Sequence, residues 1–181
     1  MAARRRKNVC EQGAALPGKI IAMQTTIDVA CRAVPGRAKA GGHFSRCIEE
    51  VTALIGRSPY PGTLNCITDH PVLLDRDKAL RFDSGTRFLW PATLNGSAVW
   101  VYRTRAMPGH VLEIVSDKKL RDRLDPDCLD RLSLKIAAEL VEPTGFLYKA
   151  AWRLIWQGRE QRYYTDDRYH KKTKRFFRYL S

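Results

Sequence analysis

The sequence predicts a compact, mainly β fold: a barrel of short strands with helical inserts, followed by a helical extension. Short segments alternate between apolar and polar residues, as strands with one buried face do. Turn signals rich in glycine, proline and asparagine separate these segments, and helical spacing is confined to a few short stretches. Many short strands joined by turns, with few helices among them, are typical of small barrels.

The first elements are expected to be a strand, a glycine-rich loop and a helix. Apolar and polar residues alternate over residues 27–33, which predicts a strand. The loop 35–42 follows, and its glycines allow the backbone to approach a ligand closely. Apolar residues then recur at helical spacing over residues 44–55, and Gly56 stands where such a helix would end.

The remaining strands of the barrel follow from the same alternation. Asn95-Gly96 is a strong turn signal and predicts a hairpin between two of them. Ser116 is a suitable cap for a short helix that would run through Leu124. The strands are expected at residues 63–67, 87–90, 98–102, 111–115 and 132–136.

A change of composition after Glu142-Pro143 predicts a separate C-terminal extension. Thr144 is expected to cap a helix, and the remainder interleaves basic and aromatic residues. We therefore divide the chain into a flexible basic arm (1–25), the barrel (26–140) and a basic, aromatic helical extension (141–181). One side of the extension's helix is expected to carry Phe146, Leu147, Ala150, Ala151, Leu154 and Ile155.

Charge and composition narrow the class of partner. The net charge of +13, much of it near the two ends, favours polyanions such as nucleotides, nucleic acids or anionic lipid surfaces. The five cysteines form no C-x-x-C pair, and their odd number argues against a disulfide framework. The sequence contains no apolar run of membrane-spanning length and no signal-type segment, so we expect a cytoplasmic protein without a transmembrane segment.

Three places carry residues suited to nucleotide chemistry. The loop 35–42 offers backbone amides and two cations for phosphate oxygens, and Thr63 and Asn65 offer hydroxyl and amide oxygens to Mg²⁺ from one face of a strand. Glu113 stands on a later strand, shortly before the basic run 118–121. Each signal alone also has an ordinary explanation: a flexible turn, turn hydrogen bonds, or a solvated strand and helix surface.

Taken in order, these pieces resemble the archaeal CTP-dependent riboflavin kinase family. The similarity covers about residues 27–137 and rests on four motifs. They are Gly41-Gly42-His43-Phe44 before a helix, Pro61-Gly62-Thr63-Leu64-Asn65, the hairpin Pro91 to Gly96, and Glu113-Ile114-Val115 followed by Lys119-Leu120-Arg121.

The resemblance implies a six-stranded cradle-loop barrel that transfers the γ-phosphate of CTP to riboflavin, giving FMN and CDP. Thr63 and Asn65 would then bind Mg²⁺, and Thr104 and Glu113 would contact the flavin. Glu113 is also the candidate to orient the acceptor hydroxyl or accept its proton. The residues implied to bind the nucleotide are Arg37, Ala38, Lys39, Ala40, Gly41, Gly42, Lys118, Lys119, Leu120 and Arg121.

A non-enzymatic interpretation remains open alongside the kinase. Related cradle-loop barrels include DNA-binding regulators, and cations interleaved with aromatics over residues 162–179 could grip phosphates and stack bases. The same segment could lie on an anionic membrane or an acidic protein, or pack its aromatics on the barrel.

Overall fold

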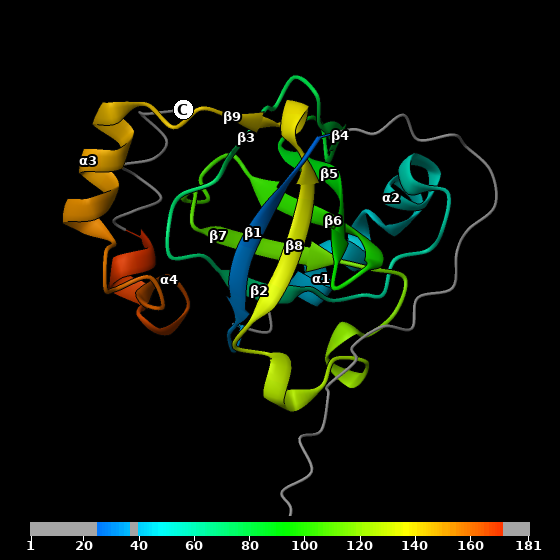
Figure 1. Cartoon of the computed structure of the whole chain (residues 1–181). Helices are drawn as coiled ribbons and strands as arrows, with labels where there is room; N and C mark the ends of the chain where they lie inside the picture. Colours follow the sequence, from blue (N-terminus) through cyan, green and yellow to red (C-terminus); the bar gives the residue numbers. More distant parts are fainter. Residues whose placement is uncertain (1–24, 37–39, 172–181) are drawn as a thin grey trace, which may run out of the picture.

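A closed barrel of six antiparallel strands forms the centre of the protein (Figure 1). The computed structural model describes residues 25–36 and 40–171. The barrel strands follow one another in the order β5-β6-β7-β2-β1-β8, and pairing of β5 with β8 closes the ring. Their bounds are β1 Thr26–Ala33, β2 Leu64–Ile67, β5 Arg87–Leu94, β6 Ser97–Thr104, β7 Val111–Val115 and β8 Leu132–Ala137.

Two further pairings extend the sheet system outside the ring. Strand β4 (Leu80–Phe82) pairs with β5, and β3 (Leu73–Leu74) pairs with β9 (Val141–Glu142) in a separate small sheet. Single turns of 3-10 helix occur at η1 (Leu120–Asp122), η2 (Pro126–Cys128) and η3 (Ala138–Leu140).

Alternation along the strands separates a filled interior from an outer face. Leu64 and Cys66 of β2 and Leu112 and Ile114 of β7 are buried in the core inside the ring. The residues between them, such as Asn65 and Glu113, must therefore face outward. The predicted hairpin is confirmed between β5 and β6: Asn95 and Gly96 have φ of 46° and 80°, as a two-residue turn of this hand requires.

Two helical layers cover the outer face on opposite sides of the barrel (Figure 1). The N-terminal layer consists of α1 (Ala40–Arg46) and α2 (Ile48–Ile55). The C-terminal layer consists of α3 (Phe146–Ile155) and α4 (Arg162–Thr165). Among the described residues, no helix combines the length and the apolar character needed to span a bilayer.

The N-terminal helices differ from the single helix predicted over residues 44–55. The backbone leaves the helical conformation at Cys47 (φ −113°, ψ 13°), so one helix becomes two, and Gly56 ends the second as expected (φ 72°). Helix α1 also begins at Ala40, which places Gly41 and Gly42 in its first turn and not in the loop.

The helix predicted from Ser116 through Leu124 was largely wrong. Only the single 3-10 turn η1 forms there, because Leu120 is drawn into the barrel core and a continuous helix would carry its side chain away. The predicted cap at Thr144 was also wrong: Gly145 precedes the first turn of α3, and the Thr144 hydroxyl donates to the Pro71 carbonyl (3.5 Å).

The apolar side predicted for α3 was wrong for its largest members and right for Ile155. Phe146, Leu147 and Leu154 are 82%, 82% and 81% exposed. Trp152 instead faces the barrel together with the partly buried Tyr148 and Ile155, which occupy the i−4 and i+3 positions. Burial of the large rings of Trp152 and Tyr148 together with Ile155 accounts for this orientation of the helix.

Candidate functional site

The candidate site lies on the outer face of three neighbouring barrel strands. Asn65 of β2 pairs with Glu113 of β7, and Glu113 pairs with Tyr102 of β6. Residues paired in this way project from the same face of the sheet, so the three side chains form a row across the strands. The row runs between the apolar clusters of the two helical layers. At one end Tyr102 packs with Phe44 of α1, and Val111, two residues before Glu113 on β7, packs with Trp152 of α3.

Three side-chain oxygens meet at one end of this row. Thr63 Oγ1 lies 3.3 Å from Asn65 Oδ1 and 3.4 Å from Glu113 Oε2. A hydroxyl has only one proton, so Thr63 can donate to one of these acceptors at a time. All three side chains are half-buried and therefore reachable from outside. The structure thus brings together the two residues predicted to bind Mg²⁺ and the predicted catalytic carboxylate.

The donor set at this cluster fits Mg²⁺. Hydroxyl, amide and carboxylate oxygens are hard ligands, and Mg²⁺ is typically held by few protein groups while it keeps waters and takes phosphate oxygens. No group of three or more His, Cys, Asp or Glu side chains suited to a metal occurs within residues 25–36 and 40–171. A cation at this site would therefore depend on neutral oxygens together with the single carboxylate of Glu113.

The end of the glycine-rich loop that the structure describes lies directly against this cluster. The Val34 N–H donates to the Asn65 carbonyl (2.8 Å), which aligns the two segments. A Cβ atom at Gly36 would lie 1.9 Å from Asn65 Nδ2, far inside van der Waals contact. Gly36 therefore lies close against the Asn65 side chain, which would have to move to admit a larger residue at this position.

Arg121 joins the same neighbourhood from η1. Its guanidinium donates to the Val34 carbonyl (2.8 Å), two residues before Gly36. Val34, just before the loop, therefore contacts both the Asn65 backbone and the predicted nucleotide-binding cation Arg121. The other predicted loop cations, Arg37 and Lys39, lie with Ala38 outside the described residues.

The basic run after β7 is not uniform. The Leu120 side chain belongs to the barrel core and is unsuited to contact a nucleotide, so only its backbone could. Lys118 and Lys119 are exposed, and Lys119 Nζ lies 2.9 Å from Asp122 Oδ1, a carboxylate that raises the pKa of the lysine.

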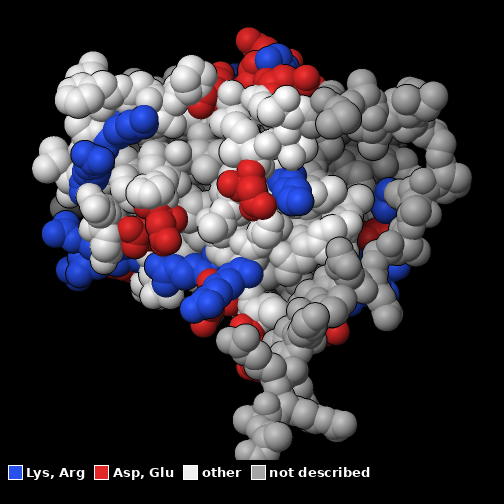
Figure 2. All heavy atoms as spheres, in the orientation of Figure 1, with Lys and Arg blue, Asp and Glu red and all other residues white. Residues whose placement is uncertain are grey.

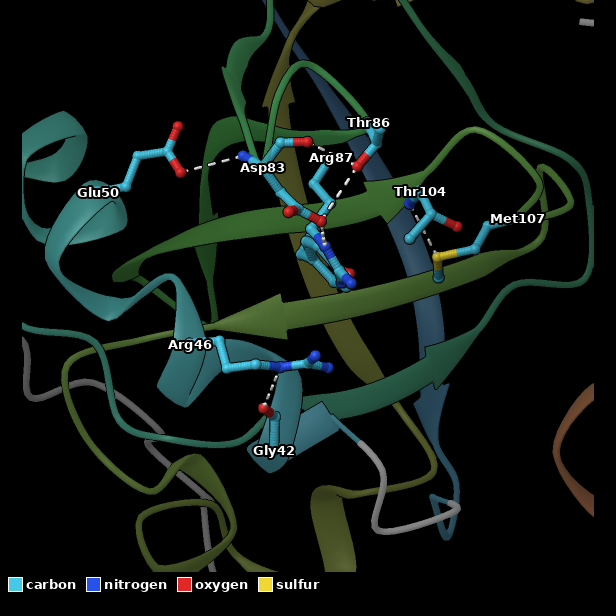
Figure 3. Close-up of polar contacts among 9 residues, drawn as sticks. Gly42, Arg46, Glu50, Asp83, Thr86, Arg87, Thr104 and Met107 are labelled. Carbon is cyan, nitrogen blue, oxygen red and sulfur yellow. Dashed lines mark hydrogen bonds and ion pairs between the residues drawn. The ribbon is translucent and has the colours of Figure 1, made fainter.

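The second predicted flavin contact, Thr104, lies further along the same face. It stands two residues beyond Tyr102 at the end of β6, so both side chains project outward. The Thr104 N–H points at Met107 Sδ (3.2 Å; Figure 3). Thr104 also lines a cavity of about 770 Å³ at this end of the barrel. Thr104 and Glu113 thus share a face but occupy different parts of it.

An arginine and a tyrosine that the sequence did not single out connect these two parts. Arg87 Nε donates to Asp83 Oδ2 (2.6 Å), and Arg87 Nη1 donates to the Tyr102 hydroxyl (Figure 3). The Asp83 N–H in turn donates to Glu50 Oε2 of α2 (3.1 Å), which ties the network to the N-terminal layer. The only signal in the sequence was a charged residue at position 87 in an otherwise apolar strand.

The electrostatics of this network follow from burial and from the arginine. Burial raises the pKa of Tyr102 to about 12, Arg87 opposes this shift, and the nearby Glu113 carboxylate adds to it. The hydrogen bonds from Arg87 and Thr86 lower the pKa of Asp83. The tyrosine is therefore neutral and accepts the hydrogen bond from Arg87, and Asp83 is a carboxylate at neutral pH.

Arg46 adds a cation that the sequence also left unnoticed. Its Nε donates to the Gly42 carbonyl (3.2 Å), and the side chain extends from α1 across the outer face on the side that carries Arg87 and Thr104 (Figure 3). Figure 2 shows a different face, the one carrying β1 and β8, where acidic and basic side chains of the described residues are interspersed without a continuous basic patch.

Comparisons with known protein families and curated proteins identify no relative of this chain. No protein-family model matches the chain, and a search of curated proteins finds no match.

Proposed function

We propose that this protein is a phosphotransferase that moves the γ-phosphate of CTP to a hydroxyl of riboflavin or a similar small molecule. The observation that carries the proposal is the cluster of Thr63, Asn65 and Glu113 oxygens with Gly36 pressed against Asn65. Phosphoryl transfer depends mainly on positioning and charge neutralisation, and this arrangement supplies groups for both. The resemblance to the archaeal riboflavin kinase family, with its cradle-loop barrel, supports CTP as the donor.

In the proposed reaction, each group of residues has its own role, which follows from its position. Thr63 and Asn65 hold Mg²⁺, which when bound neutralises charge on the nucleotide phosphates. The proposed phosphate ligands are Arg121 and the backbone amides of residues 37–42, of which Gly41 and Gly42 lie in the first turn of α1. Gly36, immediately before this segment, lies beside Asn65, the proposed metal ligand.

The acceptor would approach along the row toward Glu113, with Thr104 beyond it. The acceptor hydroxyl oxygen attacks the γ-phosphorus, and the bond from that phosphorus to the bridging oxygen breaks to release CDP. The hydroxyl proton passes to the Glu113 carboxylate, which orients the acceptor before transfer. Tyr102, held neutral by burial, lies opposite Glu113 in the neighbouring strand.

The test is to incubate the purified protein with Mg²⁺, riboflavin and each of the four nucleoside triphosphates and to measure FMN. We expect FMN with CTP, and a fall of at least about a hundredfold in rate for Asn65→Ala and for Glu113→Gln. Thr63→Ala should lower the rate as well. Thr93→Ala is its matched control and should keep full activity, because Thr93 lies on β5 in pairs with Ala98 and Lys135, away from the cluster.

Two results would contradict the proposal. One is full activity in Asn65→Ala, which would remove the metal-binding role of this cluster. The other is salt-dependent nucleic-acid binding that survives loss of Thr63 and Asn65 in a protein without CTP turnover, since that outcome favours a non-enzymatic regulator.

A further inference from the structure

A second feature of the outer face is a cavity with an unusual charge. It has a volume of about 770 Å³ and lies where the β3–β4 segment and the β6–β7 loop meet the end of β5. Its lining includes four arginines, at positions 76, 81, 87 and 105, but only a single carboxylate, that of Asp77. The size is that of a pocket for a small organic molecule.

Two of the four arginines already have carboxylate partners. Arg81 Nη2 lies 2.6 Å from Asp77 Oδ1, and Arg87 Nε lies 2.6 Å from Asp83 Oδ2. Arg76 and Arg105 form no ion pair with any carboxylate of the described residues. Two guanidinium groups thus face one cavity without a direct ion pair, although Glu142 attracts Arg76 from a longer distance.

The Arg76 side chain is fixed by contacts with its neighbours. Its guanidinium lies 5.7 Å from the centre of the Phe88 ring, and its Nη2 donates to the Arg105 carbonyl (3.2 Å). Burial, and then repulsion from Arg105, lower the pKa of Arg76. A held, partly desolvated guanidinium next to a second one is an arrangement that an anion would stabilise.

A smaller cavity of about 330 Å³ adjoins the first and shares Arg76, Phe88, Thr104 and Arg105 with it. Its wall combines the apolar and aromatic side chains of Leu73, Leu74, Trp90, Met107 and Tyr148 with Arg103 and the carboxylates of Asp75, Asp77 and Glu142. The arginine-rich cavity therefore continues into one that offers aromatic surface at Phe88 and Trp90, which favours a ligand with an anionic group attached to an apolar body.

We propose that these joined cavities bind a small organic phosphate, with the phosphate between Arg76 and Arg105 and the apolar body against Phe88 and Trp90. Guanidinium groups bind phosphate through paired, charge-assisted hydrogen bonds, and such geometry favours phosphate over a spherical anion. The site is separate from the oxygen cluster at Thr63, although Thr104, a proposed acceptor contact, lies in its wall. Phosphate binding here does not require the proposed transfer reaction to occur.

The probe for this site is phenyl phosphate, compared with phenol and with inorganic phosphate by isothermal titration calorimetry. We expect phenyl phosphate to bind more tightly than either fragment, because only it fills both cavities. Arg105→Ala should weaken phenyl phosphate binding at least about tenfold, and Arg105→Lys should restore part of it without the paired hydrogen bonds.

Two controls keep the result specific. Arg153→Ala removes an exposed arginine from α3 and should leave binding unchanged, and Arg105→Ala should keep its melting temperature because the Arg105 side chain is exposed. Asn65→Ala should also bind phenyl phosphate normally, which separates this site from the proposed Mg²⁺ site. Equal binding by wild type and Arg105→Ala, or equal affinity for phenyl phosphate and inorganic phosphate, would overturn the proposal.

Discussion

The two helical layers that flank the site use different chemistry to hold the barrel. The N-terminal layer packs Phe44 and Val51 against Phe82 and Tyr102, and the polar group of Tyr102 is satisfied by Arg87. The C-terminal layer is built almost wholly from aromatic rings around the buried His110, and includes Trp152, Trp156, Tyr163 and Tyr164. One layer is therefore apolar with a completed polar network, whereas the other buries polar atoms inside an aromatic cluster.

The difference has a consequence for the site between them. Glu113 lies between both layers, because its charge acts on a tyrosine in each. Burial is the main cause that raises the pKa of Tyr102 on one side and of Tyr164 on the other, and the charge of Glu113 adds to both shifts. A substitution in either layer should therefore change the electrostatic environment of the Glu113 carboxylate. The stability of the two layers should also respond differently to side-chain truncation, to low pH and to removal of a tyrosine hydroxyl.

The largest effect is expected from Trp156→Ala. Trp156 is fully buried, and its ring centre lies 4.6 Å from that of His110 and 4.8 Å from that of Tyr169. Truncation leaves a cavity in the aromatic cluster and should lower the free energy of unfolding by about 3–5 kcal/mol, measured by urea denaturation. Leu154→Ala on the exposed side of α3 is the control and should change it by less than about 0.5 kcal/mol. Similar losses for both would contradict this orientation of α3.

The next effect is a dependence of stability on pH that belongs to the C-terminal layer. Burial lowers the pKa of His110 to about 3, the nearby Glu160 backbone opposes this shift, and repulsion from Arg103 adds to it. Trp152 Nε1 donates to His110 Nδ1 (3.0 Å), which requires the neutral ring. Between pH 6.5 and about 3 the unfolded chain binds a proton that the folded chain resists, so stability should rise with pH across this window.

The measurement for this second prediction is the free energy of unfolding by urea at several pH values from 3 to 7. His110→Gln should make the free energy of unfolding depend less steeply on pH, because the contribution of the histidine is removed. The stability of this variant at pH 7 is expected to be lower than that of the wild type. An unchanged slope in this variant would show that His110 is not the group responsible.

The smallest effects come from one substitution made in both layers. Tyr102→Phe removes the acceptor of the Arg87 hydrogen bond and should lower the free energy of unfolding by about 1–2 kcal/mol. Tyr164→Phe removes a buried hydroxyl that has no hydrogen-bond partner among the described residues, so it should be neutral or slightly stabilising. Thermal denaturation of the pair checks the contrast, and an equal loss in both variants would refute it.

Much of the fold followed from local patterns. The alternation that predicted strands over residues 27–33, 111–115 and 132–136 corresponds to β1, β7 and β8, and Asn95-Gly96 forms the predicted turn. Period-two alternation and positive φ are short-range properties, which is why a single sequence reveals them. The prediction that Thr63 and Asn65 share a face is likewise a local one.

The orientation of α3 shows where local reasoning failed. Both faces of that helix carry apolar residues, so the spacing alone could not decide between Phe146 with Leu154 and Tyr148 with Trp152. The Tyr148 hydroxyl receives a hydrogen bond from the Gly109 N–H (2.9 Å), and Trp152 reaches His110, so partners distant in sequence selected the face.

By itself, the sequence determined the class of fold, the hairpin at Asn95-Gly96 and the residue types of the oxygen cluster. Only the tertiary structure decided that Glu113 joins Thr63 and Asn65, that Gly36 presses on Asn65, and that Arg76 and Arg105 face one cavity. These are contacts between strands and loops far apart in the chain, and they depend on strand register and barrel closure. A periodic pattern specifies which face of a strand a residue occupies, but not which residue lies opposite it.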